Sequence, residues 1–354
     1  MMASRAANEY GFVNARIRGM KSRFLSVGTY ESLLQAKSYE DFIKILSSTY
    51  YGQVISRESS TSIPTPEDLA LILSKDFAEV STNLSRSITG KVQAFTKTYL
   101  EMFLAESIKS IIRGVHVGLD RDEILRFSAP LSPEQADQFS MLVDAGSVSK
   151  LIDLIPIRDM KVALLTKLPK YEEFDSTAPL EVALEEWYLK KVLVALKEFK
   201  KDDQNRVLDL LVTRVVLRNV LTMLRALILQ LGSSAIEQSL VRFALTRELT
   251  ESLKTASTWR DVFSKLDSTR YSQLSGRLAR LYEENNDLAE IELAIEDYIA
   301  QRVKLQLTAF PFHLGTLTGF FNLKFYEIRN IRSIAVGVER QESADDIRRM
   351  ITIW

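Results

Sequence analysis

Cysteine is absent from the 354-residue sequence, which excludes disulfides, thiolate nucleophiles and cysteine-based metal sites. Histidine is rare, and His116 and His313 lie 197 positions apart, outside any His-x-x-x-His or Glu-x-x-His spacing. We expect both to be ordinary packed or surface residues. The Gly-Lys pair at 90–91 is not a phosphate loop, because Ser85 and Val92 stand where that motif needs glycine and a hydroxyl residue. The sequence therefore predicts no catalytic centre, no metal and no cofactor.

An excess of one charge is also missing. Lysine plus arginine and aspartate plus glutamate each number 46, so the formal net charge is zero, which argues against a dedicated nucleic-acid binder. The most apolar stretch, residues 207–231, is a poor membrane span because three arginines interrupt it. Residues 1–10 lack the apolar core of a secretory signal. We expect a cytoplasmic protein that neither binds nucleic acid nor spans the membrane.

Proline and glycine are scarce, at 8 and 13 residues, and no proline occurs between Pro179 and Pro311. Apolar residues are mostly three and four positions apart and strict alternation is rare, which predicts an all-α fold. Capping residues mark expected helix starts at Ser38, Thr65, Ser132, Thr258 and Ser343. Loops are expected at 56–66, 128–133, 168–179 and 315–319.

One short pattern occurs three times. A small polar residue leads into a patterned apolar run at 107–114, 219–226 and 330–337, in steps of 112 and 111 residues. An isoleucine follows ten positions after the end of each copy. Such internal similarity at one period is the signature of a repeated structural unit.

A second landmark recurs with nearly the same step. Capping residues Ser38, Ser147 and Thr258 each begin a short amphipathic run, 109 and 111 positions apart. We therefore expect three structurally similar helical units, at residues 1–127, 128–238 and 239–354, arranged with pseudo-threefold symmetry around an axis.

The most apolar helix carries a stripe of arginines. Arg214, Arg218 and Arg225 are four and seven residues apart, which places them on one helix face. The stripe has to meet water, acids of the same chain, or an acidic partner. Two interpretations stay open: an intramolecular or solvated stripe, and a stripe that lines a pore or faces a partner.

Two further charge clusters allow more than one interpretation. The acidic run at 283–297 suits the solvated face of an amphipathic helix, a docking face for a basic partner, or a carboxylate site for acid-base or metal chemistry. The basic cluster at 16–23 suits a solvated helix end or a position near anionic headgroups.

The two ends of the sequence resemble a known family. The start reads N-E-Y-G-F-V-N-A-R-I-R-G-M-K-S-R-F-L at 8–25, and the end places an apolar stretch before E-x-R-N, here Glu327, Arg329 and Asn330. Together they resemble the C-type subunits of the archaeal A-type and bacterial V/A-type ATP synthases, which are related to the d-type subunits of eukaryotic V-ATPases. The family often continues with glycine and basic residues, whereas this chain reads V-G-V-E-R-Q-E-S.

The resemblance implies an all-helical, three-lobed funnel with a central cavity. It would be a non-catalytic rotor component that couples the central shaft, of D- and F-type subunits, to the membrane rotor ring. It would transmit torque for ATP synthesis coupled to proton or sodium transport, peripheral to the cytoplasmic side of the membrane. The candidate partner-binding residues are Arg214, Arg218, Arg225, Glu327, Arg329, Asn330 and Arg332. Reversing the charge of Arg329 and Arg332 together is expected to weaken shaft binding in a folded chain.

Two other functions compete with this one. The first is a helical scaffold or adaptor unrelated to rotary ATPases, although solenoid repeats are usually about 20 to 50 residues long. The second is an enzyme with a carboxylate site at 283–297. Co-purification with ring or shaft subunits would distinguish a rotor component from an unrelated scaffold. Metal analysis of the pure protein tests the enzyme hypothesis.

Overall fold

The computed structural model describes residues 2–58, 63–126, 128, 130, 132–308 and 312–354. Within these residues every regular element is a helix and none is a strand, so the all-α expectation is confirmed for the part described. The helices are α1 (Met2–Lys21), α2 (Val27–Leu34), α3 (Tyr39–Ser47), α4 (Tyr50–Glu58), α5 (Pro66–Arg86), α6 (Gly90–Val117), α7 (Arg121–Arg126), α8 (Pro133–Val143), α9 (Val148–Asp153), α10 (Arg158–Phe174), α11 (Ala178–Leu196), α12 (Lys201–Ile228), α13 (Ser233–Ser239), the 3-10 turn η1 (Ala244–Thr246), α14 (Arg247–Leu253), α15 (Trp259–Ser264), α16 (Ser272–Asn285), α17 (Leu288–Thr308), α18 (Leu314–Glu339) and α19 (Ala344–Arg348).

The predicted capping residues begin helices as expected. Ser38, Ser147 and Thr258 precede α3, α9 and α15, and each side chain accepts a hydrogen bond from the backbone N–H three residues ahead. Thr65 forms a complete capping box with Asp68 at the start of α5. The second sequence landmark is therefore a helix start in all three copies.

Of two expected loops, the one at 168–179 is non-helical only at 175–177, and the one at 315–319 is helical throughout. Residues 168–174 belong to α10, which contains Pro169, and residues 315–319 form the first turns of α18. Gly319 signals close packing rather than a loop, because a Cβ atom there would lie 3.3 Å from the backbone oxygen of Val303 on α17. The glycine lets α17 and α18 approach each other.

The order of helices follows the period of the sequence. After α1, the sets α2–α7, α8–α13 and α14–α19 each run through a first helix, a short capped helix, a middle helix, two long helices and a short final helix. The first long helices are α5, α11 and α17, and the second are α6, α12 and α18. The exact division into units stays a prediction.

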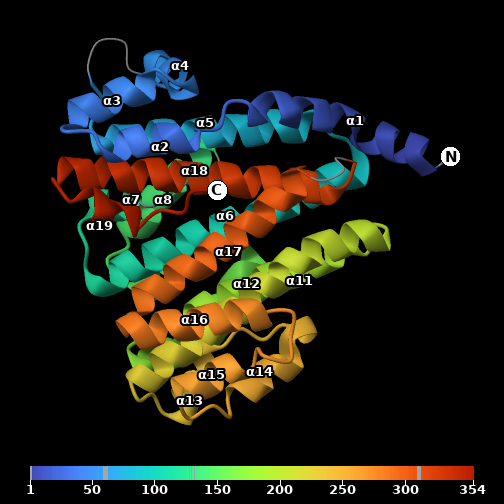
Figure 1. The fold of residues 1–354 in the computed structure, drawn as a ribbon, viewed down its shortest axis with the longest axis vertical. Coiled ribbons are helices and arrows are strands. Elements are labelled where there is room, and N and C mark those ends of the chain that lie inside the picture. Colours follow the sequence, from blue (N-terminus) through green and yellow to red (C-terminus); the bar gives the residue numbers. More distant parts are fainter. Residues whose placement is uncertain (1, 59–62, 127, 129, 131, 309–311) are drawn as a thin grey trace.

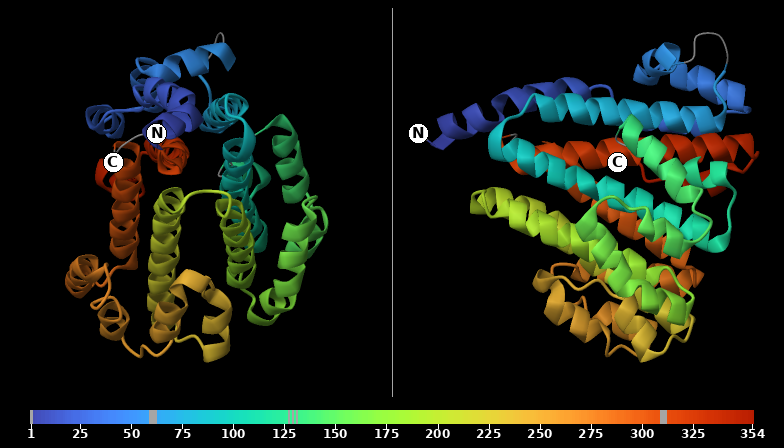
Figure 2. Two further views of the ribbon diagram at one scale, coloured as in Figure 1. Left: turned by 90° about the vertical axis from the view of Figure 1, so that its right-hand side faces the viewer. Right: turned by 180° about the vertical axis from the view of Figure 1, so that it is seen from behind.

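The six long helices pack as a closed circuit. The second long helix of each set lies against the first of the next, as α6 with α11 and α12 with α17, and α18 packs against α5 to close the circuit. The two long helices within each set are also in contact. Figure 1 shows α18 directly below α1 and α5, and Figure 2 shows the same helices from the side and from behind.

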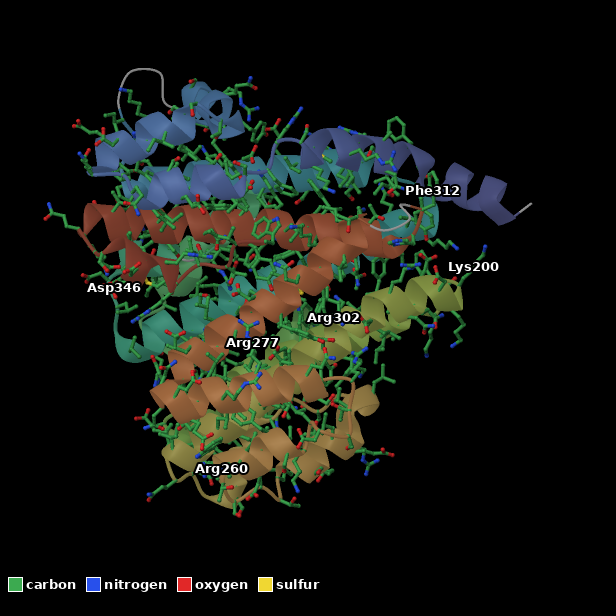
Figure 3. The ribbon with its side chains drawn as sticks, viewed as in Figure 1. Lys200, Arg260, Arg277, Arg302, Phe312 and Asp346 are labelled. Atoms are coloured by element: carbon green, nitrogen blue, oxygen red, sulfur yellow. The ribbon has the colours of Figure 1, made fainter. Side chains whose placement is uncertain are left out.

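Polar contacts reinforce the packing between the long helices. Arg302 of α17 lies against α12 (Figure 3), where its guanidinium is 2.6 Å from the carboxylate of Asp209. Arg270 donates to the same carboxylate. Asp209 therefore joins α12 both to α17 and to the segment that leads into α16.

The small polar residue of the repeated pattern has a defined task in two copies. Asn219 donates to the oxygen of Val241 at 2.9 Å and accepts from its N–H at 3.0 Å. Asn330 makes the same pair of bonds to Thr352, at 2.6 and 3.1 Å. Each asparagine side chain bonds to the backbone of the residue 22 positions later in the sequence. For Ser107 the corresponding residue is 129, which lies outside the described residues.

In the first and third copies, the isoleucine that follows packs on the last residue of the pattern. A Cβ atom on Gly114 would lie 2.5 Å from Ile124, and one on Gly337 would lie 2.5 Å from Ile347. Both isoleucines are buried, on the short helices α7 and α19. The small residue lets each short helix fold back onto its long one.

Candidate functional site

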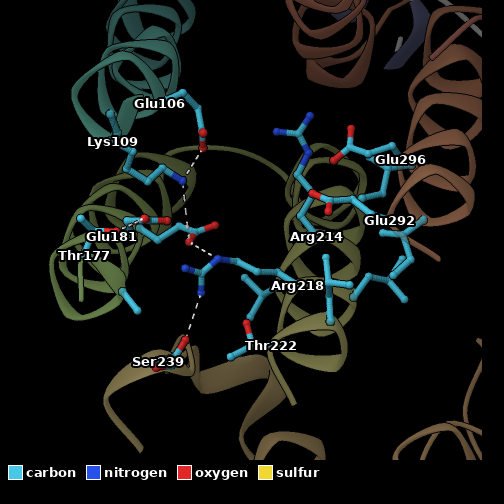
Figure 4. A pocket seen from close by; sticks show the side chains of 18 of the residues that line it. Glu106, Lys109, Thr177, Glu181, Arg214, Arg218, Thr222, Ser239, Glu292 and Glu296 are labelled. Atoms are coloured by element: carbon cyan, nitrogen blue, oxygen red, sulfur yellow. Dashed lines mark hydrogen bonds and ion pairs between the residues drawn. The ribbon is translucent and has the colours of Figure 1, made fainter. Parts of the chain in front are cut away.

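A cavity of about 710 Å³ is bounded by five of the six long helices, α6, α11, α12, α17 and α18. Among the described residues, α5 contributes no side chain to its wall. Figure 4 shows charged side chains that reach into this space from helices on both sides. A space enclosed by helices from all parts of the chain is the natural candidate for a binding site.

Two ion pairs repeat across the wall with the sequence period. Arg113 of α6 binds Glu181 of α11 in a two-pronged contact, with Nε 2.7 Å from Oε1. Arg225 of α12 binds Glu292 of α17 at 2.6 Å. The arginines are 112 positions apart and the glutamates 111, so the same joint between neighbouring long helices occurs twice.

The two joints differ in strength because they differ in exposure. The side chain of Glu181 is 12% exposed, whereas that of Glu292 is 50% exposed. Burial opposes the ionisation of Glu181, but the hydrogen bonds and charge of Arg113 outweigh it and lower the pKa of Glu181 to about 2. The Arg225–Glu292 pair is screened by water and contributes little to stability.

A second level of charges lies beside these joints. Arg218 is 2.8 Å from Glu185, and Lys109 lies between Glu185, at 3.8 Å, and Glu106, at 2.6 Å. These four groups form a line of alternating sign along the wall (Figure 4). Each charge is neutralised by a neighbour inside the cavity.

The same level recurs on the opposite wall. Arg329 of α18 is 3.2 Å from Glu296 of α17. Both residues lie 111 positions after the Arg218–Glu185 pair. The repeated sequence thus places equivalent charge pairs on different sides of one cavity.

Arg214 is the exception on this wall. Its guanidinium donates to Asn322 Oδ1 at 2.6 Å, to the hydroxyl of Tyr326 at 3.3 Å and to the sulfur of Met102 at 3.1 Å. It makes no ion pair with a carboxylate among the described residues. Arg214 therefore connects α12 to α18 and α6 through neutral groups only.

The contact between α18 and α5 is built differently from the other two joints. Ala70 and Ser74 stand where the other two first long helices carry glutamates, 111 positions before Glu181 and Glu185. Arg332 of α18 donates to the oxygen of Ala70 at 2.8 Å and also to the Ser74 hydroxyl. The two α5 positions that correspond to the paired glutamates are therefore not acidic, and among the described residues neither of them lines the cavity.

A buried polar network seals the same joint. Lys324 of α18 is 2.9 Å from Asp76 of α5 and donates to the Tyr51 hydroxyl at 2.8 Å. Tyr51 in turn donates to Glu327 at 2.6 Å, and the N–H of Leu25 donates to the same carboxylate at 2.7 Å. Burial raises the pKa of Glu327. These contacts fix α18 to the first set of helices.

Comparison with known proteins assigns the chain to a family. The sequence profile of the ATP synthase (C/AC39) subunit family matches residues 13–350. The chain belongs to the C/AC39 family of ATP synthase subunits. The resemblance seen at the two ends of the sequence is therefore confirmed over almost the whole length.

Several C/AC39 relatives match this chain over most or all of its length, each of them the C-type subunit of an A-type ATP synthase. The relative from Methanocaldococcus jannaschii is 22% identical over 345 residues, which cover 97% of this chain and 86% of that protein. The relative from Haloferax volcanii is 23% identical over 356 residues, which cover 99% and 100%. That of Methanothermobacter thermautotrophicus is 24% identical over 330 residues, which cover 92% and 83%.

Four of the residues singled out from the sequence line the cavity of this C/AC39 protein: Arg214, Arg218, Arg225 and Arg329. The arginine stripe of α12 thus faces an enclosed space, and Arg218 and Arg225 pair with acids of the same chain. The intramolecular interpretation therefore holds for Arg218 and Arg225, and contact of the stripe with a partner stays a prediction.

Glu327, Asn330 and Arg332 lie elsewhere. Glu327 and Asn330 are fully buried and bonded within the chain, and Arg332 is 8% exposed. Burial lowers the pKa of Arg332 to about 10. A carboxylate at position 332 would face the oxygens of Ala70 and Ser128. The expectation that the chain stays folded after this charge reversal is therefore not supported by the packing.

The cavity also contains residues that sequence reasoning missed: Glu106, Lys109, Arg113, Glu181 and Glu185. The 111-residue step carried a signal for the two on α11, because Glu181 and Glu185 correspond to Glu292 and Glu296. Extending the repeat from the second long helix to the first would have found them.

The acidic run at 283–297 spans the end of α16 and the first half of α17. Four of its carboxylates pair with arginines of the same chain, as Glu283 with Arg260, Glu290 with Arg349, Glu292 with Arg225 and Glu296 with Arg329. The described residues contain no group of three or more ligands suited to a metal ion. The ion pairs favour the interpretation as a solvated and paired helix face.

The two histidines and the basic N-terminal cluster have ordinary neighbours. His116 contacts the hydroxyl of Tyr171 at 3.2 Å, and His313 caps α18. Arg16 donates to a backbone oxygen of α5, and Arg23 lies over the ring of Tyr50. None of the described helices is both long and apolar enough to cross a bilayer.

Proposed function

We propose that this chain is a non-catalytic central-stalk component of a rotary A/V-type ATP synthase. It acts as a socket that receives the foot of the central shaft, of D- and F-type subunits, and rests on the membrane rotor ring. It passes torque between them, peripheral to the cytoplasmic side of the membrane. Membership of the C/AC39 family supports the assignment to such a complex.

The cavity bounded by five long helices is the observation that carries the proposal. A coupler must hold a partner against torque without slipping, which requires an enclosing wall and several polar contacts. The wall offers charged groups from α6, α11, α12, α17 and α18. Closely packed long helices supply the stiffness between the two ends.

The same proposal includes three helical units at 1–127, 128–238 and 239–354, set around the cavity with pseudo-threefold symmetry as a funnel. The repeated order of helices supports it. The equivalent ion pairs Arg113–Glu181 and Arg225–Glu292 support it as well. The family assignment counts against a scaffold unrelated to rotary ATPases.

The test is a pull-down of the purified chain against the D- and F-type shaft subunits and, separately, against detergent-solubilised rotor ring. We expect both to bind. Arg329→Glu should weaken shaft binding and leave ring binding unchanged, since Arg329 lines the cavity and its side chain is 41% exposed. Arg332 is left unchanged because it is buried.

Arg260→Glu is the matched control, because Arg260 forms an exposed ion pair on α15 outside the cavity. It should bind shaft and ring like the wild type. A wild-type chain that captures neither shaft nor ring contradicts the proposed function.

A further inference from the structure

The cavity wall carries one more basic side chain than acidic side chains. Six basic residues line the cavity, and five glutamates, described above, line it with them. The basic residues are Lys109, Arg113, Arg214, Arg218, Arg225 and Arg329. Five of the six lie within 4.0 Å of a carboxylate oxygen, and Arg214 is the one that does not, among the described residues. The unpaired positive charge of this wall therefore resides on Arg214.

The equivalent positions of the other two units are apolar. Met102 lies 112 positions before Arg214 and Phe325 lies 111 positions after it. Both line the cavity, on α6 and α18, and Arg214 touches the sulfur of Met102. One level of the wall therefore contains two apolar side chains and a single cation.

The groups that hydrogen-bond to the Arg214 guanidinium and hold it in place are all neutral. Asn322 and Tyr326 bind the same terminal nitrogen, and the ring of Tyr326 lies 6.0 Å from the guanidinium carbon. A guanidinium carries five N–H donors in a planar fork that fits a carboxylate with two parallel hydrogen bonds. In a partly enclosed space such a contact is stronger than at an open surface.

The nearest acids are already engaged. Glu106 is 2.6 Å from Lys109, and Glu296 is 3.2 Å from Arg329. A fold that neutralised Arg214 would place a glutamate opposite, as this chain does for Arg113 and Arg225. Figure 4 shows Arg214 in the space between Glu106 and Glu296.

We propose that Arg214 binds one carboxylate, an aspartate or glutamate side chain carried by the protein segment that enters the cavity. The inference rests on the proposed function and names the chemistry of the partner at this position. A single unpaired cation suits a single carboxylate, whereas a polyanion such as a nucleotide or nucleic acid would need several unpaired cations, and the other five cations of this wall are paired with glutamates.

The position of Arg214 also fixes the orientation of the partner. In the proposed arrangement, three similar units around one axis offer an entering segment three similar binding positions. Within the part of the chain that the structure describes, only the position that includes α12 presents a cation without an ion pair at this level, since Met102 and Phe325 occupy the other two. The carboxylate of the partner therefore selects one rotational position out of three.

The experiment measures the affinity of the purified full-length chain for the D- and F-type shaft pair by titration calorimetry at fixed salt. Arg214→Met copies the residue of the first unit and should bind about 10- to 100-fold more weakly, the loss of one charge-assisted hydrogen-bonded contact. Arg214→Lys should lose less, because it keeps the charge and loses the fork.

Arg206→Met is the matched control on the same helix. Arg206 forms an ion pair with Asp202 on α12 and does not line the cavity. Its replacement should leave the affinity within about twofold of the wild type, as expected for a surface ion pair. Circular dichroism verifies that each variant is folded.

A double-mutant cycle separates a binding role from a structural one. Acidic residues at the inserted end of the shaft are changed to amides one at a time. One of them should reproduce the loss of Arg214→Met and add nothing to it. A merely structural Arg214 would lower stability without coupling to any shaft acid, which would overturn the inference.

The outcomes are distinguishable. If the wild-type chain binds the shaft and Arg214→Met binds within about twofold of it, the inference fails while the proposed function stands. If the wild-type chain does not bind, both fail. Should Arg214→Met not fold, the acid-to-amide scan with the wild-type chain and with Arg214→Lys decides, and an equal response of both chains to every change overturns the inference.

Discussion

At the scale of single residues, the environment decides what each charge does. Arg214, Arg225 and Arg332 look alike in the sequence, yet one is held by neutral groups, one is in a half-exposed ion pair and one is buried. Glu181 and Glu292 are equivalent by period but differ in exposure, 12% against 50%. Ion pairs at equivalent positions of the repeat therefore contribute differently to the free energy of unfolding.

The Arg113–Glu181 pair predicts a dependence of stability on pH. The pKa of Glu181 is lowered from 4.5 to about 2 in the folded chain. A depressed pKa contributes stability that is fully present above about pH 4.5 and is lost as the pH falls towards about 2, at most about 3 kcal/mol. Urea unfolding from about pH 6 to about pH 3 should show the advantage of wild type over Glu181→Gln shrinking.

Glu292→Gln is the control for that measurement. It removes the equivalent glutamate from a pair whose side chains are 49% and 50% exposed. Its effect on the free energy of unfolding should be small, below about 1 kcal/mol, at every pH. An equal pH response of the two variants would contradict the role given to burial.

The sequence indicated the arginine stripe but not the partners of the arginines. Spacing alone places Arg214, Arg218 and Arg225 on one face, because that follows from helix geometry. Whether a face meets a cavity or a core depends on contacts far away in the chain. Arg332 illustrates this, since its burial comes from α5, more than 250 positions earlier.

At the scale of elements, glycines and asparagines of the repeated pattern attach a long helix to a later segment of the chain. Gly114 and Gly337 admit the isoleucines of α7 and α19, and Asn219 and Asn330 hold the backbone 22 positions ahead. The residues that recur in the pattern are therefore those that contact a backbone or side chain farther along the sequence.

The close approach at Gly337 predicts an unusual cost for a small substitution. Gly337→Ala would place a Cβ 2.5 and 2.8 Å from atoms of Ile347, which is 1% exposed. Overpacking of about 1–3 kcal/mol should exceed the gain of about 1 kcal/mol in helix propensity. Chemical denaturation should therefore show a lower free energy of unfolding.

Gly276→Ala tests the opposite case. Gly276 lies inside α16, and nothing lies within 4 Å of a Cβ added there. The substitution should stabilise the chain by about 0.5–1 kcal/mol. If both alanine variants gained stability alike, the contact with Ile347 would not be the reason for glycine at 337.

Local signals predict helix starts well and helix continuity less well. Ser38, Thr65 and Thr258 act on backbone groups three residues away, so the sequence contains all the information needed. The glycines at 315 and 319 favour a loop by composition, although they lie in α18, where it packs closely on α17. Glycine marks a turn or a tight contact, and only the fold separates the two.

At the scale of the whole molecule, the closed circuit makes each joint part of one structure. Two joints carry arginine–glutamate pairs at the cavity wall, and the third is sealed by Lys324 and Asp76, which are 5% and 1% exposed. The all-helical class followed from the spacing of apolar residues. The unlike third joint did not, because it depends on which side chains meet where the two ends of the chain come together.

Removing the cation of the third joint predicts a global loss of stability. Lys324→Met leaves the buried carboxylate of Asp76 without its closest cation and should cost about 3–5 kcal/mol. We expect urea unfolding curves from far-ultraviolet circular dichroism and from tryptophan fluorescence to shift together as one transition.

Arg260→Met is the control, because the Arg260–Glu283 pair is 66% and 60% exposed and should contribute less than about 1 kcal/mol. Curves that separate in the Lys324→Met chain would mean that the joints unfold independently.

The circuit of long helices is closed, and this determines how the protein responds to a lateral force. A force applied to one long helix reaches its neighbours clockwise and anticlockwise at once, through α6–α11, α12–α17 and α18–α5. The load is divided between two routes, and tightly packed interiors pass strain on with little give. Weakening any single contact between long helices should leave the other route intact. The stiffness of the protein would therefore fall before its helices separated.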